Sequence, residues 1–125
     1  MGALILDASV LIGLLDTADA HHTNAVDDVE AADRDHTLLT PASAYSETLV
    51  AFARADRIVD ARETIAAMGI EVAPLTAAIA ERAADLRAAH GRLRLPDALV
   101  LATARELSAG LLTYDDRLSR IADAT

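Results

Sequence analysis

Cysteine, lysine and aromatic residues are missing or scarce in this chain of 125 residues, and each absence excludes a class of protein. Without cysteine there is no disulfide framework, no cysteine-based zinc site and no thiol redox centre. All 11 basic residues are arginine, which excludes mechanisms that need a lysine, such as a Schiff base or a P-loop. Aromatic residues make up 2% of the chain, too few for a platform that stacks single-stranded bases.

Long hydrophobic runs are also missing. The longest, residues 10–15 and 98–104, fall far short of the about 20 residues that cross a bilayer. The first residues carry no basic segment and reach Asp7 at once, so we expect no signal peptide, no membrane contact and a cytoplasmic protein. The length suits a single domain over residues 1–125. The formal net charge of −9 argues at first against a nucleic-acid partner.

Short apolar runs alternate with amphipathic stretches, which is the pattern of a parallel sheet covered by helices on both faces. Strands are expected over residues 3–6, 37–40, 70–73 and 111–113. Helices are expected over residues 9–15, 20–33, 42–55, 58–68, 76–89, 96–109 and 115–122, with Pro41 at a helix start and Gly69, Gly91 and Gly110 as stops. The fold class is therefore α/β: a three-layer α/β/α sandwich with a short, mainly parallel sheet of four strands, a fifth being left open.

Acidic residues stand near the ends of these elements. Asp7 ends the first strand, and Asp115 and Asp116 follow the fourth, at the edge where parallel sheets bind ligands. Glu47 and Asp97 lie on helices with mostly apolar neighbours one turn away, where an ionised carboxylate is costly unless it is paired. The aspartates have an alternative interpretation as helix caps or first-turn acids, and for each of them both interpretations stay open at this point.

Clustered carboxylates suit Mg²⁺ or Mn²⁺, which prefer oxygen ligands. A cation held there can activate a water and position a phosphodiester for in-line attack, so the residues favour a metal-dependent phosphodiesterase. Other acid-site α/β folds fail on particular residues. A haloacid-dehalogenase-like phosphatase needs an aspartate where Ser9 stands, a receiver domain needs a lysine, and a dinucleotide-binding fold needs a glycine-rich turn after Asp7.

Four segments of the chain resemble the PIN domain family, and within it the VapC-type toxin ribonucleases. They are residues 4–9 (LILDAS), 45–47 (YSE), 96–104 (PDALVLATA) and 111–115 (LLTYD), which occur in the family's order and cover nearly the whole chain. The resemblance implies a Mg²⁺- or Mn²⁺-dependent endoribonuclease toxin that acts on RNA and restrains translation. It also implies a co-expressed antitoxin as partner, and a homodimer.

Carried over residue by residue, the resemblance implies a catalytic and metal-binding set of four acids. These are Asp7, Glu47, Asp97 and Asp115. Ser9 and Thr113 match hydroxyl positions near the family's metal site and are expected to orient ligands or waters. The family's Thr-x-Asp pattern favours Asp115 as the fourth acid, with Asp116 as the alternative.

Two other functions would use the same fold: a nuclease that acts on DNA or in RNA processing, and a non-catalytic PIN-like binding module. The distribution of charge agrees with a nuclease. The four proposed site acids contribute −4, and residues 16–35 contribute −6 from seven acids and one arginine, which leaves +1 for a remainder with ten arginines. We expect His21 and His22 at a solvated helix start, and the arginines on solvated faces, with the alternative that some contact RNA phosphates.

Overall fold

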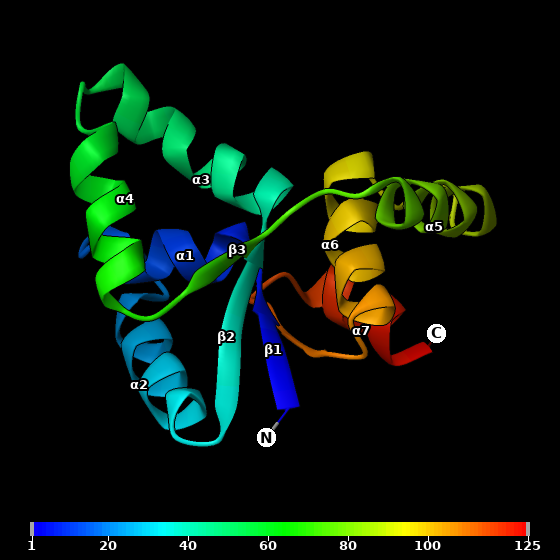
Figure 1. Ribbon diagram of the computed structural model, residues 1–125, viewed down its shortest axis with the longest axis horizontal. Helices are drawn as coiled ribbons and strands as arrows, with labels where there is room; N and C mark the ends of the chain where they lie inside the picture. Colours follow the sequence, from blue (N-terminus) through cyan, green and yellow to red (C-terminus); the bar gives the residue numbers. More distant parts are fainter. Residues whose placement is uncertain (1, 125) are drawn as a thin grey trace.

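The computed structural model describes residues 2–124 and has the three layers expected from the sequence (Figure 1). The strands are β1 (Gly2–Leu6), β2 (His36–Pro41), β3 (Glu71–Ala73) and β4 (Gly110–Leu112). The helices are α1 (Ala8–Leu15), α2 (His22–Asp33), α3 (Ala42–Arg54), α4 (Ile58–Ala67), α5 (Ala77–Ala89), α6 (Leu95–Glu106) and α7 (Asp116–Ala124). Every expected element is present, and within these residues the sheet has four strands and no fifth. None of the helices in this range has the length and apolarity needed to cross a membrane.

The sheet is parallel at every pairing, in the order β3-β2-β1-β4. Helices α1, α2 and α4 lie on one side of it and α5, α6 and α7 on the other, while α3 contacts both α1 and α6 (Figure 1). Because all strands run the same way, their carboxyl ends meet at one edge. Leu6 at the end of β1 pairs with Leu112 at the end of β4, so the segments that follow these two strands lie side by side.

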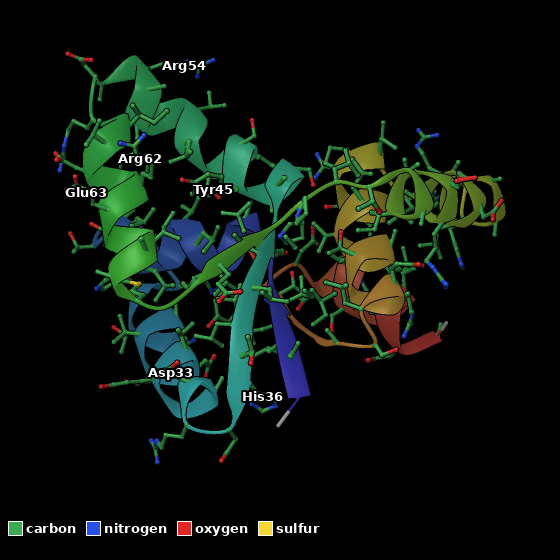
Figure 2. The ribbon with its side chains drawn as sticks, in the orientation of Figure 1. Asp33, His36, Tyr45, Arg54, Arg62 and Glu63 are labelled. Carbon is green, nitrogen blue, oxygen red and sulfur yellow. The ribbon has the colours of Figure 1, made fainter. Side chains whose placement is uncertain are left out.

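The core has two parts, one on each face of the sheet, and β1 contributes to both. Ile5 packs with the cluster of α5 and α6, and Leu6 packs with the cluster of α1 and α2; both side chains are 0% exposed. Successive residues of a strand point to opposite faces, which explains the continuous apolar run of β1. Tyr45 of α3 packs against the second cluster, and Figure 2 shows it on the side of α3 that faces α1.

The end of α6 differs from expectation in an instructive way. The helix expected to reach residue 109 ends at Glu106, because Ser108 adopts a positive φ of 51° and the Ala109 N–H donates to the Ala104 carbonyl at 2.8 Å. This closure usually employs glycine, which is why Gly110 misled the sequence prediction. Gly69, with φ of 74°, does follow α4 as expected. Pro41 ends β2 and is the N-cap residue of α3, which begins at Ala42 as predicted.

Helices α1 and α2 pack closely at Gly13. A Cβ atom at this glycine would lie 3.0 Å from the Ala25 Cβ, so an alanine here would fit only if Ala25 moved away slightly. The Nδ1 atom of His22 lies 2.7 Å from the Gly13 carbonyl oxygen and ties the start of α2 to α1. His22 therefore has a structural partner, whereas the sequence placed it in a solvated cap.

Candidate active site

The four predicted acids line one pocket at the carboxyl edge of the sheet, here called the acid pocket. Its volume is about 200 Å³, and its lining comprises Asp7, Ala8, Ser9, Ile12, Glu47, Arg94, Asp97, Val100 and Asp115. The acids come from four separate parts of the chain: the end of β1, the helix α3, the first turn of α6 and the segment before α7. Parallel strand topology accounts for the proximity of Asp7 and Asp115, which follow the neighbouring strands β1 and β4.

Asp7 is both a helix cap and a pocket residue, so its two interpretations are not exclusive. It directly follows β1, is 6% exposed, and its Oδ1 accepts the Val10 N–H at 3.2 Å as the N-cap of α1. The preceding Leu6 is held by Thr40 of β2, whose buried hydroxyl donates to the Leu6 carbonyl at 2.8 Å. The position of Asp7 is thus set by the centre of the sheet.

The side-chain hydroxyls of Ser9 and Thr113, here called the hydroxyl pair, donate hydrogen bonds to the two oxygens of the Asp7 carboxylate. The Ser9 hydroxyl donates to Oδ1 at 2.6 Å, and the Thr113 hydroxyl donates to Oδ2. Each hydroxyl in turn accepts a backbone N–H from the segment after β4: Ser9 from Tyr114 at 2.9 Å, and Thr113 from Asp115 at 3.0 Å. The hydroxyl pair therefore links Asp7 to the segment that carries the fourth acid.

The free acceptor capacity of Asp7 lies on Oδ2. A carboxylate oxygen accepts about two hydrogen bonds. Among the described residues 2–124, Oδ1 has two donors, Ser9 and Val10, and Oδ2 has one, Thr113. One further ligand can therefore bind at Oδ2 without displacing a bond that holds the carboxylate.

Asp115, rather than Asp116, is the acid that faces Asp7. Asp115 lines the acid pocket and caps α7, with its Oδ1 accepting the N–H groups of Arg117 at 2.9 Å and Leu118 at 3.2 Å. Asp116 is exposed, does not line that pocket, and instead lines a neighbouring one. Capping again fixes a carboxylate that is also part of the pocket.

Asp97 carries an ion pair with Arg94, yet its pKa is raised. It lies in the first turn of α6 with its side chain 21% exposed, and its Oδ2 is 3.4 Å from the Nε of Arg94. Burial raises the pKa of Asp97 above its usual value; Arg94 lowers it, and the charges of Asp115 and Asp7 raise it further. The three aspartates are therefore close enough to repel one another electrostatically.

Glu47 lies at the rim of the pocket. It is exposed on α3 and lines both the acid pocket and a second pocket between α1 and α3. The sequence argument that Glu47 stands among buried apolar neighbours was wrong, because Val50, one turn away, is 44% exposed. Glu47 therefore belongs to the site because it lines the pocket, and not because its side chain is buried.

Two contacts of the Tyr114 side chain, here called the Tyr114 clamp, were not predicted from the sequence. Tyr114 stands between Thr113 and Asp115 in the chain. The Tyr114 ring stacks on His21 with ring centroids 4.7 Å apart, and its hydroxyl donates to Asp28 of α2 at 2.7 Å. Burial, followed by the hydrogen bond and charge of Asp28, raises the pKa of the phenol. No periodicity links these residues, which lie about 90 positions apart. The clamp joins the acidic segment of α2 to the wall of the pocket.

The donor set suits a hard divalent cation in its chemistry, although its spacing is not that of a closed cage. All four groups are carboxylates, the ligands that Mg²⁺ and Mn²⁺ prefer. Within residues 2–124, no three histidine, aspartate or glutamate side chains are grouped so that they could hold a metal ion as they stand. Two features keep the set open: Arg94 lies against Asp97, and Glu47 stays at the rim. The mutual repulsion of the aspartates is what a bound cation would relieve.

Comparison with known proteins gives one family match along almost the whole chain. The model of the PIN domain family matches residues 4–124. No curated protein sequence matches this chain.

Solved structures with the same fold include three from bacterial toxin–antitoxin systems. VapC20 of Mycobacterium tuberculosis, described as a sarcin-ricin loop cleaving toxin, has a TM-score of 0.77 and 21% identity, with 94% of each chain covered. A toxin–antitoxin complex from Klebsiella pneumoniae has a TM-score of 0.76 and 24% identity, covering 90% of this chain and 87% of the other. VapBC2 of Rickettsia felis, bound to a promoter DNA fragment, has a TM-score of 0.77 and 13% identity, covering 95% and 92%. At these identities the likeness establishes a common fold.

Proposed function

Because the chain belongs to the PIN domain family, we propose that it is a Mg²⁺- or Mn²⁺-dependent endoribonuclease, the toxin of a VapBC-type module. The observation that carries the proposal is the convergence of four carboxylates, from four distant segments, on one small pocket. Capping accounts for the position of Asp7 and Asp115, but it does not account for Asp97 and Glu47 facing the same space.

The residues divide into those that would hold the cation and those that orient them. Asp7, Asp97 and Asp115 would be the main ligands, and Glu47 at the rim would bind the cation or orient the attacking water. The hydroxyl pair fixes the rotation of the Asp7 carboxylate and leaves Oδ2 the capacity for one more ligand. When bound, the cation would lower the pKa of a water and neutralise charge on the scissile phosphate.

The proposed physiological role is supported by neighbours with the same fold, which include a VapC toxin, a toxin–antitoxin complex and a VapBC2 assembly. The proposed role is to restrain translation by cutting RNA in the cytoplasm, as a homodimer neutralised by a cognate antitoxin. The acidic stretch over residues 16–35, which carries −6, offers charge complementarity to a basic partner. An antitoxin that placed a basic side chain among the aspartates would block the cation directly.

The test is cleavage of mixed RNA and DNA pools by the purified chain, with Mg²⁺, Mn²⁺ or EDTA. We expect cleavage of RNA that requires the cation and is lost in Asp115→Asn, since asparagine also caps a helix and should preserve the fold. Asp116→Asn is the matched control, an adjacent acid outside the acid pocket, and should retain cleavage.

Other outcomes of the same test select the alternatives. Cleavage of DNA in preference to RNA would identify a DNA nuclease of the same fold. A chain that binds no Mn²⁺ in calorimetric titration and cuts neither pool would be a non-catalytic binding module. Equal loss in Asp115→Asn and Asp116→Asn would contradict the assignment of the fourth acid.

A further inference from the structure

A larger pocket, here called the arginine pocket, adjoins the acid pocket. Its volume is about 460 Å³, and its lining consists of Arg94, Asp97, Asp115, Asp116, Arg117 and Arg120. It shares Arg94, Asp97 and Asp115 with the acid pocket, so the two form one continuous surface. Whatever is bound at the aspartates also meets the arginines.

The three arginines come from the starts of two helices. Arg94 is the N-cap residue of α6, and Arg117 and Arg120 lie one turn apart on α7, so that their side chains share a face. All three are exposed. Within residues 2–124 the side chains of Arg117 and Arg120 form no ion pair, and Arg94 has only the long contact of 3.4 Å to Asp97, with its own side chain 66% exposed. The guanidinium groups are therefore available to a ligand.

The net charge of the arginine pocket depends on whether a cation is bound. Three arginines stand against Asp97, Asp115 and Asp116, so the pocket is neutral overall when the acids are ionised. A divalent cation on Asp97 and Asp115 would make it positive by about two charges and would release Arg94 from its carboxylate. Anion binding here should then be coupled to the cation.

We propose that Arg94, Arg117 and Arg120 form a phosphate subsite, which holds a backbone phosphate of the RNA strand next to the one that is cleaved. The proposal rests on the ribonuclease function proposed above. A guanidinium matches the geometry of a phosphate with two parallel N–H donors, and it stays charged at every working pH. A contact of this kind positions the strand without reading its sequence. It also gives an acidic protein a local place for a polyanion.

The experiment compares two double variants that lose the same charge. Arg117→Ala/Arg120→Ala removes the part of the subsite that does not touch Asp97. Arg54→Ala/Arg62→Ala removes two exposed arginines from α3 and α4, which Figure 2 shows across the molecule from α6 and α7. A labelled mixed-sequence single-stranded RNA is mixed with each protein in Mg²⁺ and in EDTA. Stopped-flow anisotropy gives binding before cleavage, and gel analysis of the same sample gives cleavage.

We expect Arg117→Ala/Arg120→Ala, the α7 variant, to bind RNA about tenfold more weakly in Mg²⁺ than the wild type. The slope of log affinity against log salt concentration should decrease in magnitude by about 0.7, the value for one single-strand phosphate contact. The effect should appear in KM more than in kcat, and it should shrink in EDTA. Mn²⁺ affinity without RNA should not fall, because the variant removes positive charge from the neighbourhood of Asp97 and Asp115. Arg117→Lys/Arg120→Lys should restore the salt slope but only part of the affinity.

Three results would overturn the subsite: no change in the α7 variant, an equal change in the α3–α4 control, or a wild type that binds no RNA in Mg²⁺ at low salt. A wild type that binds RNA but never cuts it would refute the ribonuclease instead, and the binding comparison would still judge the subsite. Melting curves of each variant verify that the exposed substitutions leave the fold intact.

Discussion

Asp7 can be separated into its two roles by comparing Asp7→Asn with Asp7→Ala. The side chain accepts three hydrogen bonds, from Ser9, Val10 and Thr113, and is 6% exposed. Asparagine keeps the oxygen that caps α1 and accepts from Ser9, and its amide can donate to the Thr113 oxygen in place of accepting from it. All three bonds lose the negative charge of their acceptor, which we take to cost about 1 kcal/mol in total. Removal of a charge that repels Asp97 and Asp115 offsets part of this cost.

Alanine removes all three acceptors at once. The lost N-cap costs about 1 kcal/mol, and two hydroxyls left without an acceptor cost about 1 kcal/mol each. We therefore expect Asp7→Ala to destabilise the protein by about 3 kcal/mol and Asp7→Asn by no more than about 1 kcal/mol. For a chain of this length the gap of about 2 kcal/mol corresponds to roughly 8 °C in Tm.

Urea unfolding followed by circular dichroism in EDTA gives the two free energies of unfolding, and calorimetry with Mn²⁺ gives the affinity. Asp7→Asn should fold almost as well as the wild type yet lose Mn²⁺ binding and RNA cleavage. Equal destabilisation by the two substitutions would refute the account of the cap and the hydroxyl pair. Retained Mn²⁺ affinity in folded Asp7→Asn would refute the role of Asp7 as a ligand.

Three further predictions concern single features of the structure. Because the pKa of Asp97 is raised in the folded protein, its ionisation opposes folding above the usual aspartate pKa. Asp97→Asn should therefore stabilise the metal-free protein at pH 7, and this advantage should disappear as the pH falls through the folded pKa. Melting curves recorded over a range of pH would contradict this if the variant were less stable at pH 7. Ser9→Ala and Thr113→Val should each cost about 1–2 kcal/mol in urea unfolding, and a double-mutant cycle should depart from additivity by about 0.5 kcal/mol or more because both hold one carboxylate; strictly additive losses would show independent action. Gly13→Ala should destabilise by about 1–3 kcal/mol through overpacking against Ala25, despite the better helix propensity of alanine, whereas a rise in Tm would show that α1 and α2 can separate there.

The arrangement of strands and helices was predictable because each signal is local. Continuous apolar runs mark the buried parallel strands, and the rule that parallel strands end at one edge places Asp7 and Asp115 there from the sequence alone. The end of α6 was not predictable, since Ser108 takes a conformation that the sequence rule reserves for glycine. Local rules thus gave the elements and erred where one residue departs from its usual preference.

The interior of the site was harder to predict because it depends on side chains from distant segments. Nothing local shows that Tyr114 will stack on His21, 93 positions away. The contact of Arg94 with Asp97 is different, because the two residues are three positions apart at the start of α6, a spacing that could have predicted it. The exposure of Glu47 was missed for a related reason: an apolar lane on a helix is buried only if another element covers it, and α3 leaves Val50 in solvent.

The hydroxyl pair has a consequence for when the protein becomes active. Both N–H groups that hold the pair belong to Tyr114 and Asp115, and the fourth acid is Asp115 itself. A nascent chain contains Asp7, Glu47 and Asp97 before this segment is made, but until then neither hydroxyl receives its N–H donor and the Asp7 carboxylate lacks its bond from Thr113. If the pocket is the catalytic site, a growing chain cannot cut RNA while it is being translated. The order of synthesis would then delay the nuclease until nearly the whole domain exists, which gives a co-expressed antitoxin time to be present first.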